Sequence, residues 1–183
     1  MKAIYPKKDQ FDTTNEILLK IDKSIGSYIS IKTLVSLLTA TLSYITLLLI
    51  GIDSALFFAF LIFLLNFIPS IGSLIATIFP ALMALLQYGS ETYTPFILVV
   101  VFVGAIQLVI GNFLEPKLMG NSLNISSLVV ILSLTIWGVI WGVAGMVLSV
   151  PITVIMILIF SNFESTKKIA ILLSEKGEIN VEG

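Results

Sequence analysis

Apolar and polar positions along this chain are separated into long blocks. No Lys, Arg, Asp or Glu occurs between Asp53 and Glu91, and none occurs between Lys117 and Glu164. A helix on the surface of a soluble protein needs a wet face, so charged side chains normally recur every few residues. Uncharged stretches of this length require apolar surroundings, which the lipid bilayer supplies. The pattern therefore predicts an integral membrane protein made of α-helices.

Turn and break signals divide the apolar blocks into hydrophobic segments. The first, residues 34–52, would reach about 28 Å as a helix, close to the thickness of the hydrocarbon core. The second, residues 54–68, would reach only about 22 Å, so we expect some segments to be broken or re-entrant. The predicted fold is all-α, a polytopic transmembrane bundle with about six segments in a domain at 34–160. These segments are 34–52, 54–68, 71–87, 96–111, 125–142 and 143–160, with polar loops at 88–95 and 112–124.

The polar ends of the chain complete the predicted organisation. Residues 1–12 form a polar N-terminal segment without the apolar run and cleavage site of a signal peptide. Thr13 and Glu16 have the spacing of a capping box, so a helix is expected to start at Thr13. Apolar residues at three- and four-residue steps predict an amphipathic interfacial helix over 13–33, and a solvated linker helix is the alternative. Residues 161–183 are expected to be a polar cytoplasmic tail.

The charged residues predict the topology. The formal net charge is only −1, but the lysines gather at the two ends of the chain, and Lys117 alone lies between the segments. Because lysines concentrate in cytoplasmic loops, both termini are predicted to be cytoplasmic in a multi-pass protein of the cell membrane, with Lys117 on the same side. The lysines before the first segment and after the last are Lys2, Lys7, Lys8, Lys20, Lys23, Lys32, Lys167, Lys168 and Lys176.

The composition also excludes several kinds of chemistry. The chain has no Cys and no His, which removes disulfides, thiolate nucleophiles and the commonest metal ligands. Acidic residues are nearly absent from the apolar segments, so an intramembrane enzyme would lack an acid/base pair. No Gly-x-x-x-x-Gly-Lys run occurs that could bind a nucleotide. We therefore expect no enzyme, metal, cofactor or nucleic-acid partner.

Two polar interruptions are candidates for function. Asn66, Pro69 and Gly72 break the apolar sequence, and such breaks often line the substrate site of a transporter, although a turn between two short spans is the alternative. Asn112 and Glu115 mark the second interruption, where the carboxylate would serve proton or cation coupling or lie in a solvated loop. Gln107 lies about one helical turn earlier, and its amide would be buried unless it faces the bundle interior.

Small and aromatic residues suggest helix contacts. Gly138 and Gly142, followed by Gly145, provide small residues that allow close helix packing. Trp137 and Trp141 are expected to be interfacial anchors. A stripe of small hydroxyl residues in the first span favours helix packing, with a polar translocation lining as the alternative. The stripe comprises Ser36, Thr39, Ser43 and Thr46.

The motifs in order resemble those of the autoinducer-2 exporter family of permease-like membrane proteins. They are NFIPSIG at 66–72, NFLEPKLMG at 112–120, SLNISSLVVILSL at 122–134 and WGVIWGVAGMVLSVP at 137–151. Tyr28 and Lys32 also fit the family. The resemblance covers the carboxy-terminal half of a typical member, so the chain is expected to be a fragment or a half completed by another chain.

The resemblance implies a secondary transporter in the bilayer that exports a small polar solute such as autoinducer-2. A sodium/proton antiporter is the alternative within the family, with a monovalent cation as its partner. We expect a homo-oligomer, and place the pathway near Asn66, Pro69 and Gly72 with Gln107, Asn112 and Glu115. A non-transporting membrane scaffold or inactive fragment is the rival from another class.

Overall fold

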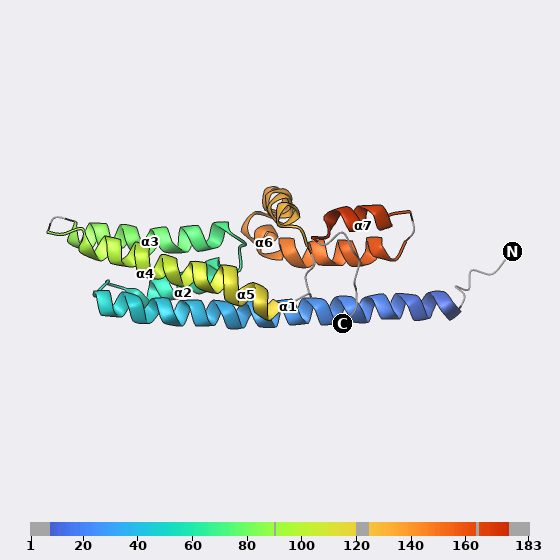
Figure 1. The fold of residues 1–183 in the computed structure, drawn as a ribbon, viewed down its shortest axis with the longest axis horizontal. Helices are drawn as coiled ribbons and strands as arrows, with labels where there is room; N and C mark the ends of the chain where they lie inside the picture. The colour runs from blue at the N-terminus through green and yellow to red at the C-terminus, as the bar shows by residue number, and fades with distance from the viewer. Residues whose placement is uncertain (1–7, 90, 120–124, 164, 176–183) are drawn as a thin grey trace. The chain divides into compact units, whose positions relative to one another are not determined.

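The computed structural model consists of α-helices joined by short turns (Figure 1). It describes residues 8–89, 91–119, 125–163 and 165–175, with only the backbone given for residues 8–14 and 16. The described chain contains no strand, which confirms the predicted all-α class. The elements are α1 (Lys8–Ile50), α2 (Ala55–Leu65), α3 (Ile71–Tyr88), α4 (Thr94–Val109), the π-helical turn η1 (Ile110–Leu114), α5 (Glu115–Met119), α6 (Ser127–Ser161) and α7 (Lys167–Leu173).

The chain divides into two compact units. Unit 1 comprises residues 1–29 and 121–183, and unit 2 comprises residues 30–120. Four helical stretches are long and apolar enough to cross a membrane, and α2 is a shorter apolar helix. Large apolar side chains on their outer faces are open, including Leu49 at 84% and Leu86 at 85% exposure. Because such faces need an apolar solvent, the chain is a multi-pass membrane protein.

Helix α1 is continuous over 43 residues. It begins at Lys8, upstream of the predicted start at Thr13, because no proline or glycine follows Pro6 until Gly26. The predicted boundary between an interfacial helix and the first span, at residues 33 and 34, falls inside this helix. The side chains of the predicted capping box, Thr13 and Glu16, lie outside what the structure describes, and so do the ends of the chain, 1–7 and 176–183.

In unit 2, α2 and α3 form a helical hairpin whose open end is tied to the end of α1. The Gly51 carbonyl accepts hydrogen bonds from Gln87 Nε2 at 2.9 Å and from Tyr88 Oη at 2.8 Å. The Asp53 N–H donates to Gln87 Oε1 at 2.9 Å. Gly51 has φ of 86°, a conformation that favours glycine. These three contacts, which we call the Gly51 clasp, join the α1–α2 turn to the last turn of α3.

The tip of the hairpin is the predicted break at residues 66–72. Ser70 precedes α3 with a positive φ of 57°. A Cβ on Gly72 would lie 1.8 Å from the Leu65 carbonyl oxygen, so only glycine permits the approach of the two helices here. The interruption is therefore a tight turn between two helices, as in the turn alternative for this motif. Its amide, Asn66, reaches Ser36 in the middle of α1.

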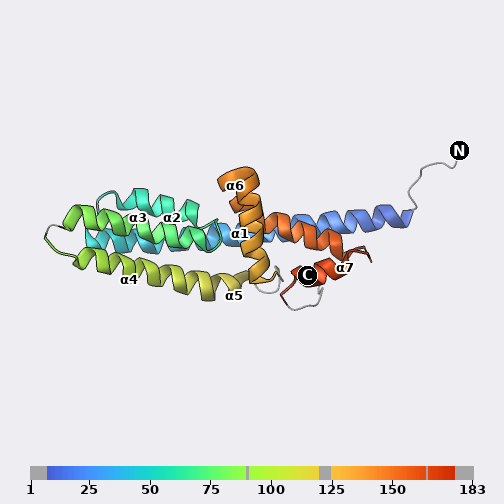
Figure 2. The same cartoon turned by 90° about the horizontal axis from the view of Figure 1, so that it is seen from above.

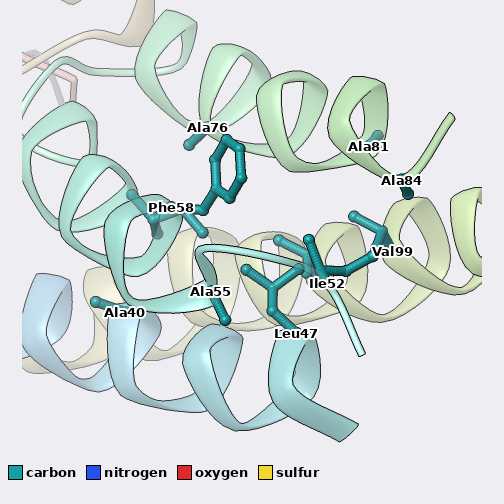
Figure 3. Packing of buried hydrophobic residues seen from close by; sticks show 11 residues of the cluster. Ala40, Leu47, Ile52, Ala55, Phe58, Ala76, Ala81, Ala84 and Val99 are labelled. Atoms are coloured by element: carbon teal, nitrogen blue, oxygen red, sulfur yellow. The ribbon is translucent and has the colours of Figure 1, made fainter. Parts of the chain in front are cut away.

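Helices α1, α2, α3 and α4 pack their small and apolar residues into one core in unit 2 (Figures 2 and 3). Alanines such as Ala76 and Ala84, 0% and 1% exposed, let the backbones approach closely. Leu47, Phe58 and Val99 fill the remaining space between the helices. The core therefore holds the hairpin against α1 and α4.

The predicted polar loop at 112–124 is wrong up to Met119, because α4 continues through η1 into α5. The Glu115 N–H bonds to the Ile110 carbonyl, five residues earlier, which widens the helix by one residue. Pro116 follows directly and has no N–H to donate. The wider turn gives the proline ring room, and the helix does not end.

In unit 1, α6 is two helical halves joined at Gly142, whose φ of 62° and ψ of −140° break the helix (Figure 1). The two halves correspond to the predicted segments 125–142 and 143–160. Ser133 and Thr153, one in each half, share a buried hydrogen bond of 2.7 Å. The expected polar tail at 161–183 contains the short helix α7, and the Leu173 carbonyl accepts a hydrogen bond from the Ser126 N–H at 3.1 Å.

The hairpin tip gives a stability prediction. Gly72→Ala should lower the free energy of unfolding by about 2 kcal/mol or more, because the added methyl group overlaps backbone atoms that cannot move freely. Gly104→Ala, in α4, is the matched control. Nothing lies within 4 Å of its Cβ, so we expect no loss of stability. Unfolding of the purified protein in mixed detergent micelles measures both, and an equal loss in the two variants would contradict the tight turn.

Candidate functional site

A line of buried polar side chains runs through the core of unit 2. On α1, Lys32, Ser36, Thr39 and Ser43 recur at three- and four-residue steps and therefore share one face of the helix. Each is at most 4% exposed. Asn66 from the hairpin tip, Gln107 from α4 and Glu115 at the start of α5 complete the set. We call these seven residues the polar column.

One end of the polar column is an ion pair. Lys32 Nζ contacts Glu115 Oε1, with the two side chains 6% and 17% exposed. Helix α1 provides the lysine, and the wide turn η1 turns the carboxylate toward it. Removing two charges from water is costly, and their mutual attraction offsets this cost only while both are present. The pair therefore couples α5 to α1.

A second contact follows one helical turn along α1. Asn66 Nδ2 donates to Ser36 Oγ at 3.2 Å, and both side chains are buried. Thr39, the next member, donates to the Val35 carbonyl at 2.8 Å within its own helix. This stretch of the column therefore has its polar atoms paired.

The far end of the column differs, because Ser43 Oγ and Gln107 Nε2 are buried without a hydrogen-bond partner among the described residues. Ser43 is 0% and Gln107 7% exposed. Buried polar groups are nearly always hydrogen-bonded, and an unpaired one costs about 1–3 kcal/mol. Ser43 and Gln107 are thus the members of the polar column whose hydrogen-bonding capacity the described part of the fold leaves unused.

The sequence-predicted site residues are only partly brought together. Asn66, Gln107 and Glu115 all belong to the polar column, whereas Pro69 and Gly72 shape the turn beside Asn66. Asn112 is exposed on η1 and is not a member of the column. The alternative prediction that Glu115 lies in a solvated loop is wrong, because its side chain is mostly buried against Lys32.

Sequence reasoning did not place Lys32 among the site residues. The signal was its position, since Lys32 extends the stripe of Ser36, Thr39 and Ser43 by one helical turn. Thr46, the predicted fourth hydroxyl of the stripe, is half-buried and donates to the Leu42 carbonyl. The buried stripe therefore runs from Lys32 to Ser43, one helical turn earlier than the predicted stripe from Ser36 to Thr46.

The glycines and tryptophans of the WGVIWGVAG motif lie around the break in α6. A Cβ on Gly145 would lie 1.9 Å from the Trp137 carbonyl oxygen, and one on Gly138 would lie 3.0 Å from Met146. Gly142 makes the turn itself and so does not share a continuous helix face with Gly138. The Trp137 and Trp141 ring centroids are 5.3 Å apart. Their role as interfacial anchors stays a prediction.

The donor set limits the chemistry of the site. No group of three or more Asp, Glu, His or Cys side chains that could hold a metal ion occurs in the described part of the chain. The column offers one ion pair and several neutral amides and hydroxyls. This arrangement can bind and pass polar species by hydrogen bonding, and it contains no pair of acids for bond-breaking chemistry.

Comparison with known proteins identifies the family. The model of the AI-2E family transporters matches residues 3–165. The chain belongs to the AI-2E family. This confirms the resemblance drawn from the motifs, and the family is one of transporters rather than enzymes.

Three AI-2E relatives show how far the similarity extends. A Borreliella burgdorferi protein, whose name assigns it to transport only provisionally, is 40% identical over 84% of this chain and 42% of its own length. YhhT of Escherichia coli K12, named in the same provisional way, is 40% identical over 82% of this chain and 42% of its own. The AI-2 transport protein TqsA of the same strain is 38% identical over 83% and 43%. The chain thus spans less than half the length of these relatives.

The buried ion pair gives a second prediction. Glu115→Gln should lower the free energy of unfolding by about 3 kcal/mol, because Lys32 would be left as a buried charge without its counter-ion. The double variant Lys32→Met, Glu115→Gln should recover most of this loss. Lys117→Met, an exposed residue two positions away, should change little. Additive losses in the double-mutant cycle would show that the two side chains do not interact.

Proposed function

We propose that this chain forms the pathway-bearing part of a secondary transporter for a small polar solute. The observation that carries the proposal is the polar column, a line of seven polar side chains inside otherwise apolar helices. Ionisable and amide side chains in a membrane interior are costly and are kept where they line a route for polar species. The hairpin of α2 and α3 supports the proposal, because its tip carries Asn66 to the polar column, and polar groups inside a membrane protein are kept where protein or a cavity covers them.

The solute we propose is autoinducer-2, moved outward. Support comes from the family and from the name of the relative TqsA, which refers to AI-2 transport. No nucleotide-binding run occurs in the sequence, so an ion gradient or the solute gradient itself would drive the movement. Alternating access would bring the polar column into contact with each side of the membrane in turn.

Cation/proton antiport is the second candidate, and the ion pair favours it. A carboxylate that is paired with a lysine can exchange that partner for a cation when the two helices separate. Glu115 is the acidic member of the column, so it would be the coupling group. A non-transporting scaffold is the rival from another class, and it would not need a buried charge pair in its core.

Orientation and assembly are further parts of the proposal. We propose insertion in the cell membrane with both termini cytoplasmic, since the lysines gather near the chain ends and at Lys117. The ion-pair end of the column then faces the cytoplasm, and the Gly51 clasp faces outward. Assembly into a homo-oligomer is likewise a proposal, and chemical cross-linking in native membranes tests it.

Flux through proteoliposomes tests the proposed function. Vesicles containing this chain should release autoinducer-2 faster than protein-free vesicles, and Asn66→Leu should reduce the rate about tenfold by removing the polar group at the hairpin tip. Thr41→Val, an exposed hydroxyl on the opposite side of α1, is the matched control and should leave the rate unchanged. Sodium-dependent proton movement without autoinducer-2 release would favour the antiporter. No flux of either kind would favour the scaffold.

A further inference from the structure

Ser43 and Gln107 face the same core from different helices. Ser43 lies between Ala40 and Leu47 on the buried face of α1, and both neighbours belong to the core of unit 2. Gln107 lies one turn beyond Val103 on the buried face of α4, and Val103 belongs to the same core. Both residues therefore lie on helix faces that pack into the same core.

The ion pair fixes how far along the helices they lie. From Lys32 to Ser43 the rise along α1 is about 16 Å, and from Glu115 back to Gln107 it is about 12 Å. Helices α1 and α4 run in opposite directions, so both distances are measured from the ion pair toward the Gly51 clasp (Figure 1). The two unpartnered groups therefore lie within about one helical turn of each other in height.

The hydroxyl of Ser43 behaves differently from its neighbours on the helix. Thr39, Thr41 and Thr46 each donate to the carbonyl four residues earlier, the usual way for a hydroxyl to be satisfied within a helix. Ser43 Oγ has no such bond. Its hydrogen-bonding capacity is therefore directed away from its own helix and into the core.

The chemistry of these groups selects an uncharged ligand. Gln107 presents an unpartnered amide nitrogen, which donates, and Ser43 presents a hydroxyl, which both donates and accepts. Neither group carries charge, and the sequence has no charged residue between Glu91 and Glu115. A buried cation needs several oxygen ligands, more than the Ser43 hydroxyl and the single Gln107 amide oxygen supply. The arrangement suits a hydroxyl or carbonyl oxygen.

We propose that Ser43 and Gln107 form a subsite of the polar column that binds an uncharged, oxygen-bearing small solute. The polar column then contains two chemically distinct sites. One is the charged pair of Lys32 and Glu115, and the other is the neutral subsite of Ser43 and Gln107, deeper in the core. The neutral subsite determines which solute is bound. It stabilises a solute that forms hydrogen bonds, and it has no charged group to offset the desolvation of an ion. This inference rests on the proposed function for its place in transport, but the binding it describes can be measured separately.

Thermal unfolding of the purified full chain tests the subsite without transport. In the absence of solute, Gln107→Leu should raise the Tm, because it replaces a desolvated amide that lacks a partner with an apolar side chain of similar size. A lower Tm would mean that the amide has a partner within the protein or an ordered water, and would overturn the proposal.

Solute addition gives the second measurement. Autoinducer-2 and the uncharged polyol erythritol, each titrated to saturation, should raise the Tm of the wild type. Gln107→Leu and Ser43→Ala should each weaken the apparent affinity at least tenfold. Thr46→Val, a half-buried hydroxyl of α1 that lies outside the polar column and already bonds the Leu42 carbonyl, is the matched control and should keep the affinity. Sodium chloride and choline chloride should give equal Tm values.

The remaining outcomes separate this inference from the proposed function. No Tm shift with either uncharged probe, a shift that persists in Gln107→Leu, or a sodium-specific shift that Gln107→Leu abolishes would each overturn the subsite. Autoinducer-2 flux that is unchanged in Gln107→Leu would be consistent with the proposed transporter and would contradict the subsite. Solute-dependent Tm shifts without any flux would retain the subsite and remove the transporter.

Discussion

The fold of unit 2 depends on one constraint: a polar group at membrane depth has no water to bond and must find its partner within the protein. The constraint explains why Lys32 meets Glu115 and why the amide at the hairpin tip meets Ser36. It also explains the route of the backbone. Gln87 and Tyr88 both bond the carbonyl at the end of α1, where the helix leaves a backbone group unpaired.

Small residues make this arrangement possible. The hairpin reverses where Gly72 permits contact with the Leu65 carbonyl, and α6 reverses where Gly142 adopts a positive φ. Alanines line the core of unit 2. With the helices this close, short side chains such as Ser36 are long enough to reach a neighbour, and the polar groups need no long flexible arms.

The sequence was sufficient for the helical class and the position of the hydrophobic segments, because long uncharged runs leave few alternatives. It located Asn66, Gln107 and Glu115 through their polarity in apolar surroundings. It failed at residues 112–119, where Pro116 and neighbouring polar residues suggest a loop, since a π-helical turn depends on tertiary packing that no local pattern reveals. It also could not pair Lys32 with Glu115, because 83 residues separate them and only the fold brings them together.

The Gly51 clasp determines how the two ends of the hairpin are held. Three hydrogen bonds hold its open end, and one described side-chain hydrogen bond, from Asn66 to Ser36, holds its tip. A neutral hydrogen bond contributes only about 1 kcal/mol, little more than thermal energy. The core of unit 2 holds the hairpin between these two ends, where Ile62 and Ala76 are fully buried. Any displacement of the tip would break the Asn66–Ser36 contact and uncover the middle of α1.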